Sequence, residues 1–141
     1  MNREFQQVSG RCLCGAVKFS LSGAATSFHL CYCSRCRHST GSAHASNIFS
    51  QPDNITWLCG KDNIQRFELP SAKSWAKQFC KTCGSGLPYV NRSGTHLVIP
   101  AGSLDDEISF EPDDKIFCDA RTNWVNSIPE KREFPGLPDQ F

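Results

Sequence analysis

Seven of the nine cysteines in this chain fall in three short groups: Cys12 and Cys14, then Cys31, Cys33 and Cys36, then Cys80 and Cys83. Cysteines one or two residues apart aim two sulfurs at one point without straining the backbone, and tetrahedral Zn²⁺ takes thiolates at about 2.3 Å. Disulfides are the competing interpretation, but cysteines this close in sequence rarely bridge well. The spacing therefore predicts zinc.

Residues at the start of this sequence do not resemble a secretion signal. Residues Met1 to Gly10 include no apolar run of the kind that directs a chain across a membrane. Thiols that stay reduced are typical of the cytosol. We therefore expect a cytoplasmic protein with free thiolates.

The seven clustered cysteines divide unequally between two metals. A closed structural site takes four thiolates, which leaves three for a second ion. The run from Cys31 to Cys36 supplies three sulfurs from six consecutive residues, while a fourth position can face water or substrate. Such an open position is typical of catalytic zinc. We expect two zinc ions per chain, one structural and one catalytic.

The spacing leaves the pairing of the sulfurs open. Cys12 and Cys14 can join Cys80 and Cys83, or either pair can close around two sulfurs of the central run. We favour the first arrangement, because two pairs far apart in sequence would join the early and late parts of a small domain through metal. The alternative is one structural zinc, with the remaining thiols reduced in the core.

Length and charge limit the class of protein. A chain of 141 residues suits one domain, residues 1–141, with a single modest core. A net charge of +1 offers no basic surface for nucleic acid, and zinc bound to four or three thiolates would add a net charge of about −2 or −1. No stretch approaches the roughly 20 apolar residues of a membrane span. We expect neither nucleic acid nor a membrane as partner.

Alternating apolar residues predict strands. The pattern runs through residues 17–21, 55–58, 75–79 and 96–99. Turn-forming residues separate these segments, at positions 60–63, 91–94 and 111–114. Short strands with frequent turns predict a small, mainly β, antiparallel fold with one or two short helical turns.

One short helix is expected beside the central cysteines. Ser34 can cap a helical turn that runs to Thr40, and Gly41 can end it. The first backbone N–H groups of such a turn would point toward the sulfurs of Cys33 and Cys36 and stabilise their charge.

The last eight residues contain two prolines and suit neither a helix nor a central strand. We expect this tail to pack across the surface through Phe134, Leu137 and Phe141.

Three segments carry a more specific signal: GRCLCGAV at Gly10–Val17, CYCSRCR at Cys31–Arg37 followed by Gly41, and FCKTCGS at Phe79–Ser85. In this order they resemble the glutathione-dependent formaldehyde-activating enzymes and their relatives, which include the centromere protein V group. The resemblance covers nearly the whole chain. The sequence departs from it at Tyr32, where the family commonly has His.

The resemblance implies a zinc-stabilised β fold similar to the Mss4-like group. It assigns the structural zinc to Cys12, Cys14, Cys80 and Cys83. It assigns the catalytic zinc to Cys31, Cys33 and Cys36. The family's reaction joins glutathione and formaldehyde to S-hydroxymethylglutathione, and the reverse direction breaks a carbon–sulfur bond.

The resemblance thus implies a zinc-dependent carbon–sulfur lyase that acts on a small thiol and an aldehyde. Zinc would either help the thiol to lose its proton or polarise the carbonyl oxygen. The rival hypothesis is a non-catalytic, zinc-stapled protein-interaction module, because Mss4-like folds also serve in that role.

Several residues outside the cysteine groups are candidates for other roles. Cys59 and Cys118 have apolar neighbours and are expected to be buried bystanders. The histidines are expected to be structural or exposed rather than ligands: His29, His38, His44 and His96. Glutathione carries two carboxylates, so four cations are candidates to bind it: Arg35, Arg37, Lys73 and Lys77. Trp75 and Phe79 are expected to pack in the core.

Overall fold

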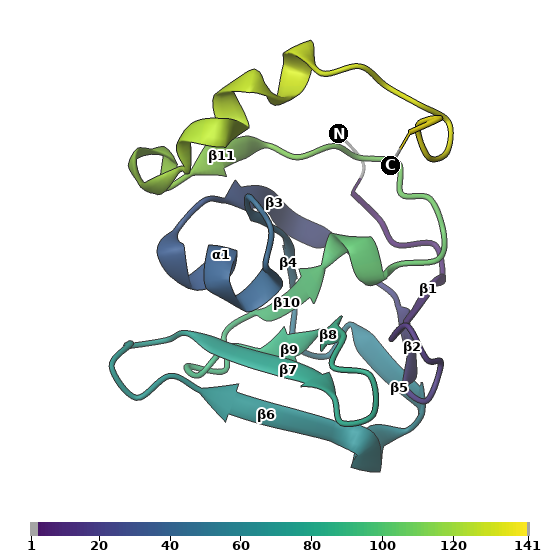
Figure 1. Ribbon diagram of the computed structural model, residues 1–141. Coiled ribbons are helices and arrows are strands. Elements are labelled where there is room, and N and C mark those ends of the chain that lie inside the picture. The colour runs from purple at the N-terminus through teal and green to yellow at the C-terminus, as the bar shows by residue number, and fades with distance from the viewer. Residues whose placement is uncertain (1–2, 141) are drawn as a thin grey trace.

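The computed structural model describes residues 3–140, and its strands form three sheets (Figure 1). The strand orders are β1-β2-β5, β11-β3-β4-β10-β9 and β6-β7-β8. The strands are β1 (Val8–Arg11), β2 (Lys18–Leu21), β3 (Ala25–Cys31), β4 (Ala45–Ser50), β5 (Ile55–Cys59), β6 (Ile64–Glu68), β7 (Ala76–Cys80), β8 (Gly86–Leu87), β9 (Tyr89–Val90), β10 (Leu97–Pro100) and β11 (Asp114–Ile116). The expected fold class, a small, mainly β fold of Mss4-like type with short helical turns, is confirmed.

The strands predicted from alternation are present as β2, β5, β7 and β10, and each end lies within one residue of its predicted position. Neighbouring strands pair antiparallel, as expected, at all ladders between the described strands except one. The exception is β11, which runs parallel to β3. A parallel edge strand needs a long connection to reach its partner, and no local pattern in the sequence announced it.

The core lies against one face of the five-stranded sheet. Side chains opposite each other in an antiparallel ladder share a face, and the register places Phe28, Ile48 and Ile99 in one row across β3, β4 and β10. These three side chains pack with Phe19 and Leu87 from the other two sheets in one buried cluster. The opposite face of the same sheet is left for α1 and for the polar groups described below.

The helix α1 spans Ser34–Thr40 and ends at Gly41, as predicted. Gly41 adopts φ 66°, a left-handed conformation that suits glycine, and its N–H donates to the Arg37 carbonyl. The cap is Cys33 and not Ser34: Cys33 has extended backbone angles, and its sulfur accepts the N–H of Cys36 at 3.3 Å. A thiol sulfur here takes the place of the usual hydroxyl oxygen.

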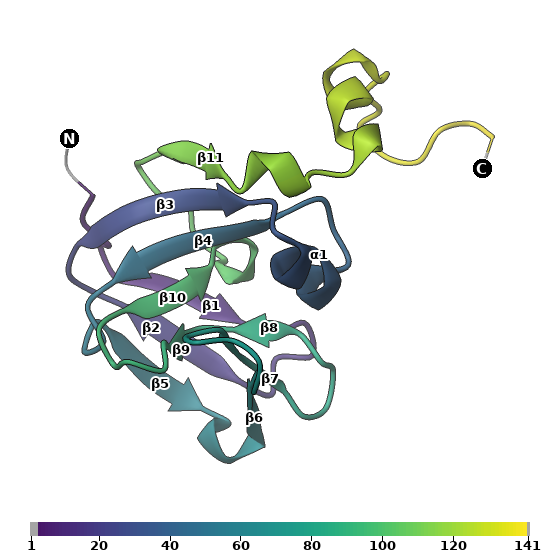
Figure 2. The same cartoon turned by 90° about the vertical axis from the view of Figure 1, so that its left-hand side faces the viewer.

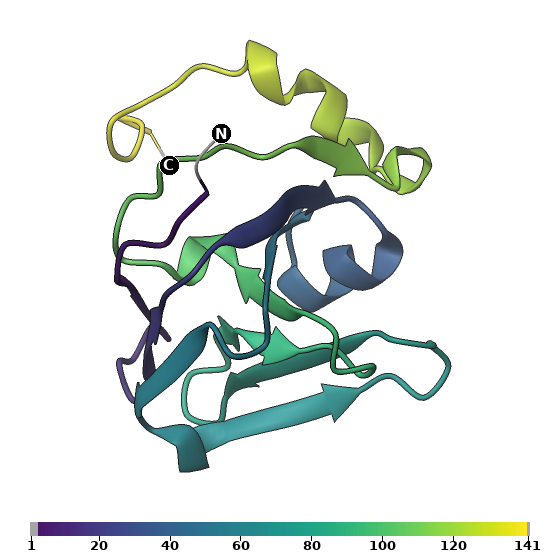
Figure 3. The same cartoon turned by 180° about the vertical axis from the view of Figure 1, so that it is seen from behind.

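Four 3-10 segments complete the regular structure of the described residues: η1 (Lys61–Asn63), η2 (Ala101–Ser103), η3 (Cys118–Ala120) and η4 (Asn123–Glu130). Figure 2 shows η4 and the segment after it leaving the body beyond β11. Figures 1 and 3 place β6 and β7 at the opposite end of the molecule from β11.

The prediction that the tail packs across the surface is wrong for Phe134 and Leu137, which are 46% and 75% exposed. Phe141 lies outside the described residues. We call residues 117–140 the C-terminal arm. Its loop and turn backbone hydrogen bonds join arm residues only, so little holds these apolar side chains against the body.

None of the helices in residues 3–140 has the length and apolar character needed to span a membrane.

Candidate metal centres

The first centre gathers four sulfurs from two distant turns. Cys12 and Cys14 follow β1, while Cys80 ends β7 and Cys83 lies in the next turn, and all four sulfurs lie within 4.8 Å of one another. The sulfur of Cys14 is 3.7 Å from that of Cys12 and 3.8 Å from that of Cys80. A tetrahedron with metal–sulfur bonds of about 2.3 Å has sulfur–sulfur edges of about 3.8 Å. The donor set and its spacing therefore fit one zinc ion.

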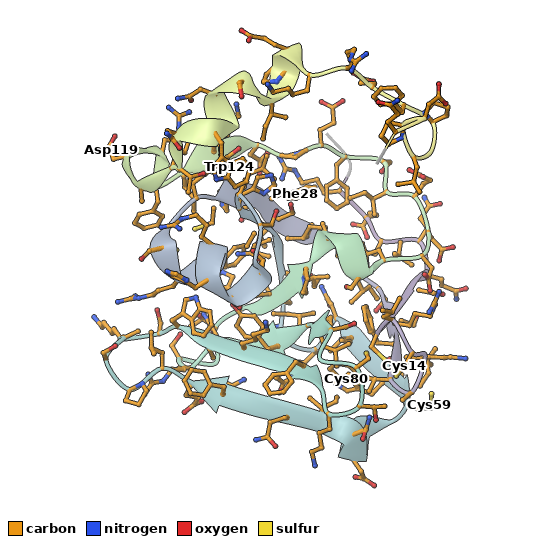
Figure 4. All side chains as sticks on the ribbon, in the orientation of Figure 1. Cys14, Phe28, Cys59, Cys80, Asp119 and Trp124 are labelled. Carbon is orange, nitrogen blue, oxygen red and sulfur yellow. The ribbon has the colours of Figure 1, made fainter. Side chains whose placement is uncertain are left out.

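Hydrogen bonds to two of these sulfurs stabilise their thiolate forms. The side-chain amide of Asn63 donates to the sulfur of Cys80 at 3.3 Å, and the hydroxyl of Ser85 lies 3.2 Å from the sulfur of Cys83. The Ser85 hydroxyl, helped by backbone amides, lowers the pKa of Cys83 to about 5. Since the metal binds thiolates, groups that stabilise the thiolate favour binding. Figure 4 shows Cys14 and Cys80 together on one side of the molecule, with Trp124 at the other end.

The second centre gathers three sulfurs from one short segment. Cys31 is the last residue of β3, Cys33 caps α1, and Cys36 lies in the first turn of the helix; the three sulfurs lie within 4.8 Å of one another. Cys31 and Cys36 are buried and Cys33 is half-buried. The neighbouring Cys36 side chain lowers the pKa of Cys31 to about 6, while Cys31 and burial raise the pKa of Cys36. Three thiolates fit a zinc ion that keeps its fourth position for another group.

Two open cavities flank this three-cysteine centre. The first, of about 560 Å³, extends from Cys36 toward Cys12 of the four-cysteine centre. The second, of about 600 Å³, lies over Cys31 and Cys33. Four residues line both cavities and form the wall between them: Cys36, Asn47, Trp75 and Tyr89. A small molecule in the second cavity could contact all three sulfurs, and one in the first cavity could contact Cys36.

Tyr89 and Asn47 were missed by the sequence analysis, and Trp75 was expected in the core. Trp75 is half-buried and lines both cavities instead. Burial raises the pKa of Tyr89 to about 12. The three residues come from different strands or loops, so no sequence motif joins them. The sequence of β4, ASNIFS, does not alternate apolar and polar residues, so nothing in it marked Asn47 as a site residue.

The candidate cations separate into two groups. Lys77 lines the first cavity and donates to the Ser39 carbonyl at 2.7 Å, while Arg35 lines the second. Arg37 and Lys73 line neither cavity. The first cavity also contains Arg11, which no sequence argument singled out. Each cavity thus presents at least one cation to an anionic ligand.

The histidines lie outside both sulfur groups, and among residues 3–140 those two groups contain cysteine alone. His29 lines the second cavity, and its Nδ1 lies 2.6 Å from the carboxylate of Asp114. His44 packs against Tyr32, with ring centroids 5.0 Å apart. These contacts agree with the expected non-ligand roles.

The expectation that Cys59 and Cys118 are buried is wrong. Cys59 is exposed and Cys118 is half-buried. Cys59 ends β5, which lies at the edge of its sheet, and Cys118 begins a 3-10 segment of the C-terminal arm. Apolar neighbours in sequence do not bury a residue at a sheet edge, because nothing covers its outer side.

Comparison with known proteins identifies a family and proteins of similar fold. The family model described as glutathione-dependent formaldehyde-activating enzyme matches residues 7–120. This match includes all seven clustered cysteines and ends before η4. No curated protein matches the sequence significantly.

The crystal structure of a Rhodobacter sphaeroides protein is similar in fold, with a TM-score of 0.60 and 20% sequence identity. The similarity covers 76% of this chain and 98% of that one. It supports the fold alone.

Proposed function

Since this chain belongs to the glutathione-dependent formaldehyde-activating enzyme family, we propose that it is a zinc-dependent carbon–sulfur lyase. It forms or cleaves the adduct of a small thiol and an aldehyde, such as S-hydroxymethylglutathione. One observation carries the proposal: three thiolates, one short of a closed zinc site, lie at the wall between two open cavities. A purely structural zinc would have a closed shell.

In this proposal the two sulfur groups have different tasks. The closed group holds a structural zinc: Cys12, Cys14, Cys80 and Cys83. The open group holds the catalytic one: Cys31, Cys33 and Cys36. Zinc bound in the open group would supply Lewis acidity, which favours the thiolate form of the substrate or polarises its carbonyl.

The protein's own residues bind and orient the substrate. Glutathione has two carboxylates, and Arg35 lines the second cavity as a cation that could bind one of them. Two cations line the first cavity, where Lys77 also donates to the Ser39 carbonyl and Arg11 lies 3.3 Å from the Asp105 carboxylate. A cavity of several hundred Å³ is of the size that holds a small molecule. The half-buried Trp75 offers a flat apolar surface between the two cavities.

We also propose a cellular location, a domain organisation and a set of partners. All nine cysteines are free thiols within residues 3–140, which supports a reducing, cytoplasmic environment. We take residues 1–141 as one zinc-binding domain whose partners are a small thiol and an aldehyde, with no nucleic acid or membrane partner.

The rival function, a zinc-stapled interaction module, is supported by a different observation. The C-terminal arm exposes large apolar side chains, among them Trp124 at 52% and Ile128 at 49%. Exposed apolar groups on one segment are a common feature of protein-binding surfaces. The lyase remains the better proposal, because an interaction module has no need of an incomplete metal shell beside two cavities.

The test is exchange NMR of glutathione, formaldehyde and their adduct, with zinc-loaded protein against a buffer control, since the reaction has an uncatalysed background. We expect the Cys33→Ser variant to bind one zinc fewer and to lose at least about 100-fold of the acceleration. Cys118→Ser is the matched control, because Cys118 lies outside both sulfur groups, and it should exchange at the wild-type rate. If Cys33→Ser lost its metal yet kept the exchange rate, the lyase proposal would be wrong.

A further inference from the structure

The five-stranded sheet turns a row of side chains toward the three-cysteine centre. Side chains opposite one another across its antiparallel ladders share a face, and so do alternate residues along each strand. One such face, opposite to the apolar core face, carries Cys31, Ala45, Asn47, Phe49, Val98 and Tyr89. The tertiary register therefore brings Asn47 and Tyr89 to the same side of the sheet as the Cys31 sulfur.

Both polar groups on this face have unused hydrogen-bonding capacity. Within residues 3–140, neither the side-chain amide of Asn47 nor the hydroxyl of Tyr89 hydrogen-bonds to another group of the chain. Other polar side chains of the first cavity are already engaged: Lys77 donates to the Ser39 carbonyl, and Gln78 donates to the Pro88 carbonyl at 2.8 Å. Half-buried polar groups that face a cavity without a partner are the groups a ligand can satisfy.

The two groups are both donors of the kind that an oxygen accepts. A phenol keeps its proton at neutral pH, and a carboxamide offers two N–H donors. Both line the two cavities together with Cys36. A ligand oxygen next to the three sulfurs could therefore be reached from the tyrosine and from the asparagine.

We propose that Asn47 and Tyr89 form the binding site for the oxygen of the aldehyde and of the adduct's hydroxyl, an inference that rests on the proposed lyase function. When the thiol adds to the aldehyde, a sulfur–carbon bond forms and the carbonyl π pair moves onto oxygen. The oxygen takes up one proton and the thiol gives up one, so the step balances without a further reactant. Two donors aimed at that oxygen stabilise its growing charge, as in other acyl- and carbonyl-transfer sites.

The site also explains discrimination between an adduct and an alkylated thiol. A hydroxyl in this position would satisfy both donors, whereas a methyl group of the same size would leave them unpaired in a half-buried place. An unpaired buried polar group costs more than the hydrogen bond contributes. Affinity should therefore depend on the hydroxyl itself.

The test uses two stable analogues of S-hydroxymethylglutathione in which a methylene replaces sulfur. They are γ-glutamyl-δ-hydroxynorvalyl-glycine, which ends in the hydroxyl, and γ-glutamyl-norleucyl-glycine, which has a methyl group in its place. Isothermal titration of zinc-loaded protein measures both dissociation constants without any turnover. We expect the wild type to bind the hydroxyl peptide about tenfold more tightly.

The variant Tyr89→Phe with Asn47→Ala should bind both peptides about equally. Its zinc content and circular dichroism should match the wild type, since neither residue belongs to a sulfur group. Asn126→Ala is the matched control, because Asn126 is an exposed asparagine of the C-terminal arm, and it should keep the tenfold preference. Tyr89→Phe alone gives a milder change if the double variant is poorly folded, and it should reduce the preference by several-fold.

Equal binding of both peptides by the wild type would overturn the oxygen site, while the exchange assay with Cys33→Ser would still decide the lyase function on its own. If the wild type bound neither peptide, the oxygen site would also be refuted.

Discussion

Cys33 is both a member of the three-cysteine centre and the N-cap of α1. Its sulfur belongs to the three-cysteine centre, and the same sulfur accepts the N–H of Cys36, one of the free N–H groups in the first turn of α1. A thiolate accepts such a bond better than a neutral thiol does. Metal binding, which requires the thiolate, and the start of the helix therefore favour each other.

Position 60 requires glycine, because of its own backbone conformation and because the backbone of Ala16 lies close to it. Gly60 has φ +79°, and a Cβ atom placed on it would lie 1.9 Å from the carbonyl oxygen of Ala16. We expect Gly60→Ala to lower the free energy of unfolding by about 3 kcal/mol, because both the backbone conformation and the contact are unfavourable.

Gly94→Ala provides the control for that prediction. Gly94 has a similar φ of +76°, but no atom lies within 4 Å of its added Cβ, so it should lose only about 1 kcal/mol. Urea unfolding of the zinc-loaded proteins measures both. Equal losses would show that the contact with Ala16 carries no weight.

At the level of elements, one carboxylate secures the parallel strand β11. Asp113 directly precedes this strand; its N–H donates to the Phe28 carbonyl at 2.7 Å, and its carboxylate accepts the Phe28 N–H at 2.9 Å. The carboxylate also pairs with Arg3. A three-residue strand has few ladder bonds of its own, so these contacts help to hold β11 to β3.

This pairing predicts a pH dependence of stability. The hydrogen bond from Arg3, followed by that from Phe28, lowers the pKa of Asp113 to about 2. A lowered pKa in the folded state means that the carboxylate stabilises the fold above its ordinary pKa of 3.8 and loses this contribution as pH falls toward about 2.

The measurement is the difference in unfolding free energy between the wild type and Asp113→Asn, so that loss of zinc in acid affects both proteins alike. The difference should be constant between about pH 7 and pH 5 and should shrink by about pH 3. Asp119→Asn, on the exposed arm, should show no such change. A difference that did not vary with pH would contradict the assigned role of Asp113.

On the scale of the whole molecule, the two candidate metal centres connect different parts of the fold. The four-cysteine centre joins the turn after β1 to the turn after β7, which belong to different sheets. Cys12 and Cys80 also belong to the main core cluster. The three-cysteine centre joins only the end of β3 to the adjoining helix. Loss of the first centre therefore separates parts of the fold that loss of the second leaves together.

Cys80→Ser should consequently lower the thermal midpoint by more than about 10 °C, because metal held only by the folded chain contributes several kcal/mol to stability. Cys33→Ser should lower it by less than half of that. Differential scanning calorimetry with zinc analysis measures both effects, and equal shifts would refute the division of roles between the two centres.

The C-terminal arm should be dispensable for folding. Deletion of residues 123–141 removes mostly exposed side chains, and the loop hydrogen bonds of the described arm stay within it. We expect a loss of less than about 1 kcal/mol in unfolding free energy and no change in zinc content. A larger loss would mean that the arm packs on the body more firmly than its exposure indicates.

Local geometry was available from the sequence. The spacing of the cysteines indicated two groups of sulfurs, because two thiols one or two residues apart converge within a single turn. The helix after Cys33 and its end at Gly41 were predicted for the same reason, since caps depend on a few neighbouring residues. The alternation that predicted β2, β5, β7 and β10 is likewise a property of each strand by itself.

Which side chains share a face of a sheet, and which residues lie at its edge, depend on the order of the strands in the sheet. Only the tertiary structure decided these properties. The sequence could not place Asn47 and Tyr89 on one face beside the Cys31 sulfur, because that requires the register across β3, β4, β10 and β9. The exposure of Cys59 at a sheet edge has the same origin. The spacing of sulfurs within each short cysteine segment is fixed by bonds along the chain. The meeting of Cys12 and Cys14 with Cys80 and Cys83, the cavities and the exposure of side chains are fixed by contacts between segments far apart in the sequence.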